Sequence, residues 1–246
     1  MEDNITTSFQ RCEKKYFLTA RQYPRLLAAI APYVRPDVYG QYSIHNIYYD
    51  TPDFRLIRAS IEKPVYKEKL RVRSYVVPGE TDSVFVELKK KFDGVVYKRR
   101  TVMPEYLVEP FLCGLVPGGR YGQIGREIAW FQNTYRAVPK AYIGYKRTAF
   151  AGIVDEELRI TFDTDLRWRD RDLDLCKGEQ GALLLPEDQI LMEIKLPGVC
   201  PLWLSRVLSE NELFPTSFSK YGACYQKYLL PAWEAKMKKT EAFYCA

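Results

Sequence analysis

Charged and apolar residues alternate along much of this sequence, and this pattern restricts the fold more than any other feature. Between residues 67 and 73 every odd position is Lys or Arg, while Leu70 and Val72 stand at even positions. Successive side chains of a β-strand point to opposite faces, so the pattern predicts a strand with one charged and one apolar face. Similar alternation, rich in β-branched and aromatic residues, predicts eight strands, over Phe9–Phe17, Ser43–Tyr49, Tyr66–Val77, Ser83–Lys91, Val95–Met103, Ala141–Phe150, Leu158–Asp165 and Ile190–Leu196.

Helices are predicted between and after these strands, where apolar residues recur at helical spacing. They cover Arg21–Tyr33, Tyr106–Leu112, Gly125–Arg136, Pro201–Leu213 and Tyr221–Ala235. Phe92-Asp93-Gly94 predicts a tight hairpin, because Asp-Gly suits the backbone of such turns. No linker, repeat or low-complexity segment interrupts the chain, which predicts an α+β protein with a single domain over residues 1–246.

A glycine-rich segment, residues 118–125, could be taken for a phosphate-binding loop. Its glycines follow a GxxGxxG spacing, which differs from the GxGxxG and Walker patterns of nucleotide-binding loops. No predicted strand leads directly into it. We therefore predict a flexible surface loop here.

Histidine and cysteine usage excludes several classes of enzyme. His45 is the single histidine, so no histidine-rich metal site can form. No GxSxG motif accompanies it, and we interpret His45 as a structural residue of a strand. The six cysteines are scattered without a CxxC pair, so neither a zinc site nor a disulfide framework is expected.

The chain carries no signal for a membrane or for secretion. No apolar run approaches the roughly 20 residues of a membrane-spanning helix, and the N-terminal region lacks the apolar core of a secretory signal. With 47% apolar residues, the chain can bury a large core. We therefore expect a cytoplasmic protein without a direct membrane span.

The charged faces of the predicted strands are mainly basic. Lysine and arginine outnumber acidic residues 37 to 31 in the chain, which gives a net charge of +6. Sorting the strands by parity places ten cations on the charged faces: Arg11, Lys15, Arg71, Arg73, Lys89, Lys98, Arg100, Arg147, Arg159 and Lys195. It places four acids there: Glu13, Glu87, Glu193 and Asp163. If these faces converged, their mutual repulsion would favour binding of a polyanion. We favour a closed barrel with a charged interior over the alternative, an ordinary sheet with one solvated face.

Nine short segments, taken in order, resemble the VTC-type polyphosphate polymerase domain of the triphosphate tunnel metalloenzyme (CYTH-like) superfamily. The similarity extends from about Phe9 to Leu229. The segments are Arg11–Tyr16, Ile47–Thr51, Leu70–Arg73, Val86–Lys89, Tyr97–Arg100, Tyr145–Phe150, Leu158–Thr164, Leu191–Lys195 and Phe218–Tyr221. Each segment is weak by itself, but nine in the same order are fairly specific for the family.

The resemblance implies a closed tunnel of eight antiparallel strands with a basic lumen, flanked by helices. It also implies an enzyme, an ATP-dependent polyphosphate polymerase that transfers the terminal phosphate of ATP to a growing polyphosphate chain. The partners are then ATP and inorganic polyphosphate, and the cofactor is Mn²⁺ or Mg²⁺.

The resemblance and the strand parity together predict the site residues. Phosphate or nucleotide binding is expected at Arg11, Lys15, Arg71, Arg73, Lys89, Lys98, Arg100, Tyr145, Arg147, Arg159, Lys195, Ser219 and Lys220. Of these, the residues expected to be catalytic are Lys15, Arg71, Arg73, Lys89, Arg147, Arg159 and Lys220. Glu193 matches the metal-binding glutamate of the family, and Glu13 and Glu87 are expected to assist it.

Other functions stay open at this point. A metal-dependent triphosphatase would pass the phosphate to water, but the predicted lumen has few acids to orient water, so we favour synthesis. A non-catalytic module could bind polyphosphate or nucleotide. A nucleic-acid partner is not expected, because the aromatic residues fall on apolar faces. An outer-membrane barrel would conflict with the helices and the cysteines, and any membrane or regulatory partner is unknown.

Overall fold

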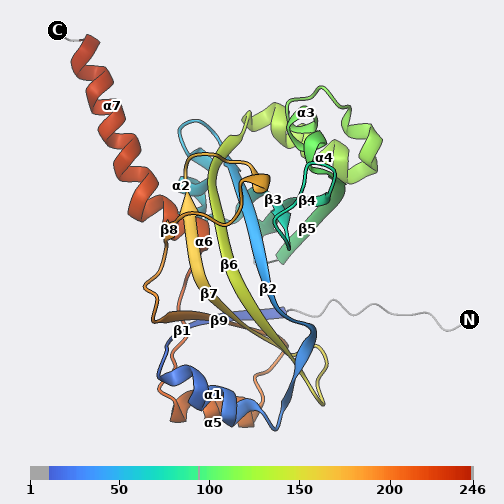
Figure 1. Cartoon of the computed structure of the whole chain (residues 1–246), viewed down its shortest axis with the longest axis vertical. Coiled ribbons are helices and arrows are strands. Elements are labelled where there is room, and N and C mark those ends of the chain that lie inside the picture. Colours follow the sequence, from blue (N-terminus) through green and yellow to red (C-terminus); the bar gives the residue numbers. More distant parts are fainter. Residues whose placement is uncertain (1–10, 94, 245–246) are drawn as a thin grey trace, which may run out of the picture. The chain divides into compact units, whose positions relative to one another are not determined.

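The computed structural model describes residues 11–93 and 95–244, and the side chains of 13–93 and 95–238 (Figure 1). The chain forms two compact units. Unit 1 comprises Met1–Tyr42, Lys146–Asp165 and Leu185–Ser217; unit 2 comprises Ser43–Tyr145, Leu166–Leu184 and Phe218–Ala246. Three strands contribute residues to both units: β2 (Val34–Asp50), β6 (Val138–Gly152) and β7 (Arg159–Arg169). The single domain over 1–246 stays a prediction.

Unit 1 is an antiparallel sheet with two helices on one face. Its strand order is β1 (Arg11–Thr19), β9 (Gln189–Pro197), β7, β6 and β2. Helices α1 (Gln22–Ile30) and α5 (Leu202–Glu210) lie side by side against this sheet (Figure 1).

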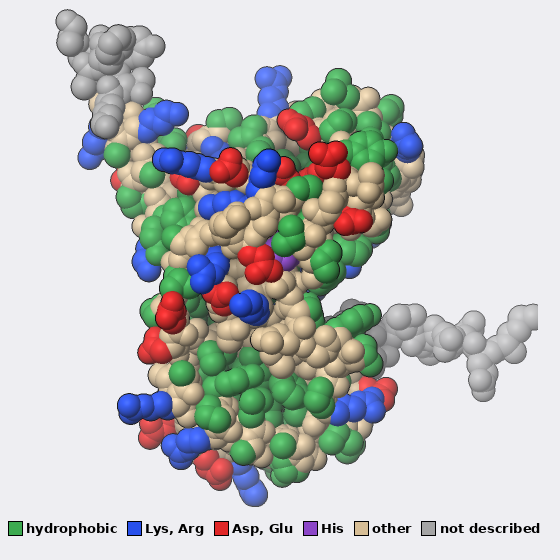
Figure 2. All heavy atoms as spheres, viewed as in Figure 1, with side chains coloured by type: hydrophobic (Ala, Val, Ile, Leu, Met, Phe, Trp, Pro, Cys, Tyr) green, Lys and Arg blue, Asp and Glu red, His purple; other side chains and the backbone are tan. Residues whose placement is uncertain are grey.

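Alternate residues of the strands in unit 1 form its core with the helices. Ile160, Phe162 and Met192 on the strands pack with Leu26 and Leu204 on the helices. Hydrophobic side chains gather on the face of unit 1 between its strands and these helices (Figure 2). Burial of each large apolar side chain contributes about 1.5–3 kcal/mol, so this layer fixes which faces of β7 and β9 carry the charges.

Unit 2 contains the meander β2, β3 (Tyr66–Ser74), β4 (Ser83–Phe92) and β5 (Val95–Pro104), with β6 and β7 on the other side of β2. The short strand β8 (Ala182–Leu183) pairs with β7. Its helices are α2 (Arg55–Ile61), α3 (Val108–Leu112), α4 (Gly122–Tyr135), α6 (Lys220–Cys224) and α7 (Leu230–Tyr244). Single turns of other helix types cover Glu105–Leu107, Gly118–Tyr121, Leu175–Lys177 and Tyr225–Leu229.

Helices α3 and α4 cover one face of the β3–β5 meander (Figure 1). Leu70 and Leu88 point toward the helices and are fully buried, and Phe111 and Phe131 meet them from α3 and α4. Because side chains alternate along a strand, this packing turns the Lys and Arg residues of β3 and β4 to the opposite face.

The prediction of an α+β fold with an antiparallel sheet and flanking helices is confirmed, but the prediction of a closed eight-stranded tunnel is not. The sheet has nine strands among the described residues, and its order is open, from β1 to β5. One residue on the outer edge of β1 pairs with a residue that belongs to no named strand. The N–H of Thr216 donates to the carbonyl oxygen of Lys15 at 2.7 Å.

Several local predictions need correction. Strand β2 begins at Val34, well before the predicted Ser43, although it contains Pro36 and Gly40, residue types that are depleted in strands. The glycine-rich segment is helical rather than flexible: a Cβ at Gly125 would lie 2.3 Å from the carbonyl oxygen of Gly118. Those glycines allow a short 3-10 turn to pack closely on α4.

Other predictions hold in outline. The hairpin is confirmed, since Phe92 pairs with Val95, although Gly94 lies outside the described residues. Helix α2 was not predicted. The expected Tyr221–Ala235 helix is confirmed, and it consists of α6, a π-type turn and α7, which follow one another without a break. In the described ranges, no helix combines the length and the apolar character needed to span a membrane.

Candidate functional site: a cationic face on strands β3 to β5

Basic side chains form rows across the meander of unit 2. Lys69 on β3 stands opposite Lys89 on β4, which stands opposite Lys98 on β5. In the neighbouring row, Arg71 stands opposite Glu87, and Glu87 opposite Arg100. We call this surface the cationic face; its residues are Lys69, Arg71, Arg73, Lys89, Lys98 and Arg100, with Glu87 as the one carboxylate in these rows.

Glu87 lies between Arg71 and Arg100, which we call the arginine row, and binds both of them. Its Oε2 accepts from Nε of Arg71 at 2.7 Å, and its Oε1 accepts from Nε of Arg100 at 2.7 Å. Arg73 Nε lies 3.9 Å from Oε2. Burial alone would raise the pKa of Glu87, but the surrounding guanidinium groups outweigh burial and lower the pKa to about 2. Glu87 is therefore ionised at neutral pH and is already engaged by arginines.

Lys69, Lys89 and Lys98, which we call the lysine row, place three positive charges on neighbouring strands. Directly opposed like charges destabilise an antiparallel pair. Lys67, the preceding residue on the same face, has a lowered pKa because of its burial and because Lys91 and Lys89 lie close. Burial is the larger cause and the neighbouring ammonium groups add to it, so an anion bound here would be attracted to several positive charges.

Two residues near the C-terminus join this surface. Ser219 Oγ accepts from Nζ of Lys69 at 3.3 Å. The ammonium group of Lys220 lies 4.3 Å from the ring centroid of Tyr145. The hydroxyl of Tyr145 accepts from Nη2 of Arg73 at 3.4 Å. The structure thus brings together the predicted residues of unit 2, which come from segments far apart in the sequence.

In unit 1, the predicted cations are matched by carboxylates. Arg147 donates to both oxygens of Asp163, at 2.6 and 2.8 Å. The remaining pairs are Lys15 with Glu13 at 3.2 Å, Lys195 with Glu193 at 2.7 Å, and Arg159 with Asp37. Each of these four cations therefore contacts an acid, and a strongly basic face is not shown in the described part of unit 1.

Glu193 is a buried carboxylate surrounded by cations. Burial alone would raise its pKa, but Lys195 and other nearby cations outweigh burial and lower the pKa to about 2. Thr161 is its neighbour across β7 and β9. The Oγ1 atom of Thr161 is buried and has no hydrogen-bond partner among the described residues. A carboxylate beside an unsatisfied hydroxyl offers oxygen donors of the kind that Mg²⁺ and Mn²⁺ prefer.

A different cluster has the spacing of metal ligands. Among the described residues, the group that brings three potential ligand atoms within 4.8 Å is Glu105, Asp174 and Cys176 in unit 2. Burial and the two carboxylates raise the pKa of the Cys176 thiol to about 12. A thiol that stays protonated is a poor metal ligand, and none of the predicted metal residues belongs to this group.

The remaining sequence predictions have mixed outcomes. Arg11 lies on β1, but its side chain is outside the described residues.

His45 is buried, and its Nδ1 lies 2.8 Å from the Tyr142 hydroxyl. This agrees with a structural role. Sequence reasoning missed Asp37 as the partner of Arg159, because Asp37 lies in the part of β2 before Ser43, where no strand was predicted.

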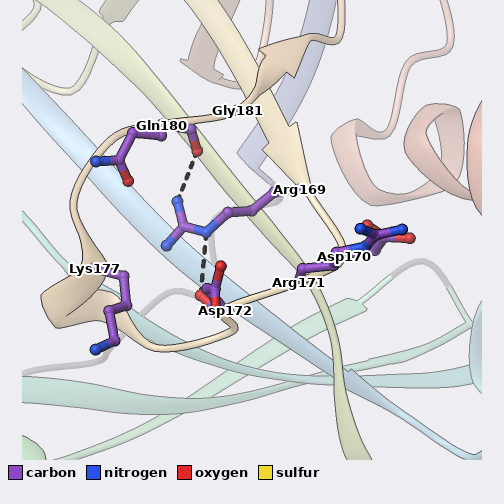
Figure 3. Close-up of a pocket in the computed structure, with 7 residues that line it drawn as sticks. All are labelled: Arg169, Asp170, Arg171, Asp172, Lys177, Gln180 and Gly181. Carbon is purple, nitrogen blue, oxygen red and sulfur yellow. Dashed lines mark hydrogen bonds between the residues drawn. The ribbon is translucent and has the colours of Figure 1, made fainter.

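A pocket of about 420 Å³ lies in the β7–β8 connection of unit 2 (Figure 3). Arg169 points into this loop and donates to the carbonyl oxygens of Gln180 at 2.8 Å and Asp172 at 3.1 Å. Its guanidinium also stacks 3.7 Å from the ring centroid of Tyr142. Arg169 therefore holds the loop together, and the pocket does not include any predicted site residue.

The fold and the arrangement of its charges define a class of antiparallel α+β proteins with a basic strand face. Residues 10–229 match the VTC domain, so the chain belongs to the VTC domain family. This confirms the resemblance found in the sequence.

Solved structures share the fold at low identity. A candidate adenylate cyclase from Bacillus halodurans is 13% identical with a TM-score of 0.50, and the alignment covers 84% of this chain and 92% of that chain. A candidate adenylate cyclase from Vibrio parahaemolyticus is 11% identical, covering 87% and 97%, with a TM-score of 0.47. The mimivirus capping enzyme triphosphatase is 11% identical, covering 83% and 89%, with a TM-score of 0.36. At 13% identity, the comparison with the Bacillus halodurans protein shows the fold alone, and no curated protein matches the sequence.

Proposed function

We propose that this protein is a polyphosphate polymerase that transfers the terminal phosphate of ATP to a growing polyphosphate chain. One observation carries the proposal: the row Lys69–Lys89–Lys98 lies beside Arg71 and Arg100 with a single carboxylate among them. A polyphosphate chain carries negative charges at regular intervals, and these charges can pair with cations that are arranged in rows. Membership of the VTC domain family supports the same substrate class.

The side chains of the cationic face suit phosphoryl transfer. This reaction depends mainly on positioning and on charge stabilisation rather than on covalent chemistry. Arginines such as Arg71 and Arg73 can bind phosphate oxygens in a bidentate manner, while lysines such as Lys89 act as point charges. The acceptor is a phosphate end, which is already anionic and needs no base. The buried His45 is therefore not required for proton transfer.

We propose that a divalent cation, Mn²⁺ or Mg²⁺, is held in unit 1 by Glu193 with Thr161 beside it. When bound, the metal would offset negative charge on the phosphate oxygens. Lys195 would then be displaced from Glu193, its present partner at 2.7 Å. Glu13 and Glu87 as further ligands stay predictions, and Glu87 is already engaged by arginines.

Transfer to phosphate is favoured over hydrolysis by the composition of the site. A triphosphatase has to orient water, for which several free carboxylates are useful. The acid of the cationic face, Glu87, is bound by Arg71 and Arg100. Closure of the sheet into a tunnel with a basic lumen, and a cytoplasmic location, stay predictions drawn from the sequence.

The test is to incubate the purified full chain with ATP and Mn²⁺ and to separate the products on a gel. Long phosphate chains with release of ADP are expected. ADP with free phosphate would instead identify a triphosphatase. If ATP stays intact while tripolyphosphate binds, the protein is a binding module and the polymerase proposal is wrong.

A further inference from the structure

Asp50 ends strand β2 in unit 2 and has no role in the function proposed above. Its side chain is fully buried. Its carboxylate accepts from the backbone N–H groups of Leu56 at 2.9 Å and Ile57 at 3.0 Å, in the first turn of α2. It also accepts from the hydroxyl of Tyr221 at 3.0 Å. Asp50 therefore connects the start of α2 to a residue 171 positions further along the chain.

Tyr221 connects this carboxylate to the cationic face. Its ring stacks on Tyr48, with centroids 4.9 Å apart and planes 7° apart. The hydroxyl of Tyr48 accepts from Nη1 of Arg71 at 3.3 Å. Burial, together with the charge of Asp50, raises the pKa of Tyr221, so its hydroxyl remains a hydrogen-bond donor to Asp50 at all physiological pH values.

Tyr221 also lies next to the two C-terminal site residues. Ser219 caps the start of α6, where its Oγ accepts from the N–H of Gly222 at 3.2 Å. Lys220 follows and places its ammonium group over the Tyr145 ring. Helix α6 runs without a break through a π-type turn into α7, and its first residues are held by tertiary contacts. The buried bond between Tyr221 and Asp50 is one such contact.

We propose that Asp50 is a positioning residue: through the Tyr221 hydroxyl it fixes the start of α6 and so holds Lys220 at the cationic face. The inference rests on the proposed function, because it assumes that the cationic face binds a chain of phosphates. It assigns a purpose to a buried carboxylate that touches no phosphate-binding cation itself.

The test uses Tyr221→Phe, because Asp50→Ala would also remove the capping of α2. Phenylalanine keeps the stack on Tyr48 and so keeps the contact between Tyr48 and Arg71, while the bond to Asp50 is lost. The matched control is Tyr228→Phe. Tyr228 is also stacked, on Trp168 at 4.3 Å, and its hydroxyl also donates one hydrogen bond, to the Leu183 carbonyl at 3.2 Å.

The measurement is the affinity of the full-length variants for tripolyphosphate, by calorimetric titration without nucleotide or metal. Loss of one hydrogen bond predicts about fivefold weaker binding for Tyr221→Phe and unchanged binding for Tyr228→Phe. In a chain that already carries Lys220→Ala, adding Tyr221→Phe should weaken binding no further, because Tyr221 acts through Lys220.

Three outcomes would overturn the inference. Equal affinities for the two phenylalanine variants would show that Tyr221 does not position the site. If Tyr221→Phe weakened binding about fivefold even in a chain that carries Lys220→Ala, Tyr221 would act on the site by a route other than Lys220. If Lys220→Ala and Arg71→Ala both left the affinity unchanged, the proposed function itself would fail, and the positioning role with it.

Discussion

The two units use the same alternation of charged and apolar residues but reach opposite electrostatic results. In unit 1, the cations at Lys15, Arg147, Arg159 and Lys195 each contact a carboxylate. In unit 2, Arg71, Arg73 and Arg100 share one carboxylate, Glu87. The comparison teaches that parity places a cation on a face, whereas the neighbours on the adjoining strands decide whether its charge is already balanced.

The difference suggests a division of roles. Balanced ion pairs stabilise a fold and leave little affinity for further anions. Lysines that stand opposite one another on neighbouring strands lower the stability of the sheet, and a bound anion would reduce this repulsion. We therefore expect unit 2 to contribute most of the phosphate affinity, and the acids of unit 1 to contribute metal binding. Four measurements test this contrast, from the largest expected effect to the smallest.

Arg147→Ala should strongly destabilise the protein. Asp163, its partner, is fully buried, and removal of one member of a buried ion pair costs about 3–5 kcal/mol. Urea denaturation measures the change. The control is Arg35→Ala, whose partner Glu156 is exposed; it should change the stability by less than about 1 kcal/mol. A small effect of Arg147→Ala would show that the charges of unit 1 are not structurally paired.

Glu193→Gln should lower metal-dependent turnover about 100-fold or more, because the proposed cation would lose its charged ligand. Binding of tripolyphosphate without metal should stay within twofold of wild type, since that binding is assigned to unit 2. Turnover comes from the product assay and affinity from calorimetry. Retained turnover would remove Glu193 from the metal site.

The stability of the fold should decrease at acid pH, because protonation of Glu87 removes its ion pairs with the arginines. The pKa of Glu87 is lowered from 4.5 to about 2 in the folded protein. Its ionised form therefore stabilises the fold above its usual pKa, and this contribution is lost as the pH falls from about 4.5 through about 2. The stability at stake is on the order of 2 kcal/mol, after allowance for coupling to the arginines.

Glu87→Gln should remove this part of the pH dependence, as measured by urea denaturation at a series of pH values. The matched control is Glu156→Gln, which changes an exposed carboxylate of unit 1 and should leave the curve as in wild type. An unchanged curve for Glu87→Gln would show that Glu87 does not hold the arginine row.

Lys89→Ala should weaken tripolyphosphate binding about tenfold, because one cation of the lysine row is lost. Lys146→Ala removes an equal charge from unit 1, where Lys146 pairs with Asp165 at 3.2 Å. It should change the affinity less than twofold. Equal losses for the two variants would mean that net charge, rather than the lysine row, determines binding.

Much of the cationic face could be predicted from sequence because it depends on local geometry. The parity of Arg71 and Arg73 follows from Leu70 and Val72, which the core must bury. The tight turn after Phe92 then fixes the register that opposes Lys89 and Lys98. Short connections leave few alternative alignments.

Other parts of the site could not be predicted because they depend on residues far apart in the chain. The pairing of Arg159 with Asp37 joins positions 122 residues apart, and nothing in either local pattern points to the other. The bond between Tyr221 and Asp50 is of the same kind. Such contacts arise from the packing of whole elements, which local pattern does not encode.

The sequence by itself determined the family, the strand faces of the meander and the identity of most cations of the cationic face, because each follows from alternation and from short ordered motifs. Only the tertiary structure decided which carboxylate contacts Arg71, Arg147 and Arg159. It also showed that the sheet order is open, with Thr216 on the edge of β1. The reason is physical: a charge is balanced by whatever lies within a few ångströms of it, and that neighbour is chosen by long-range packing.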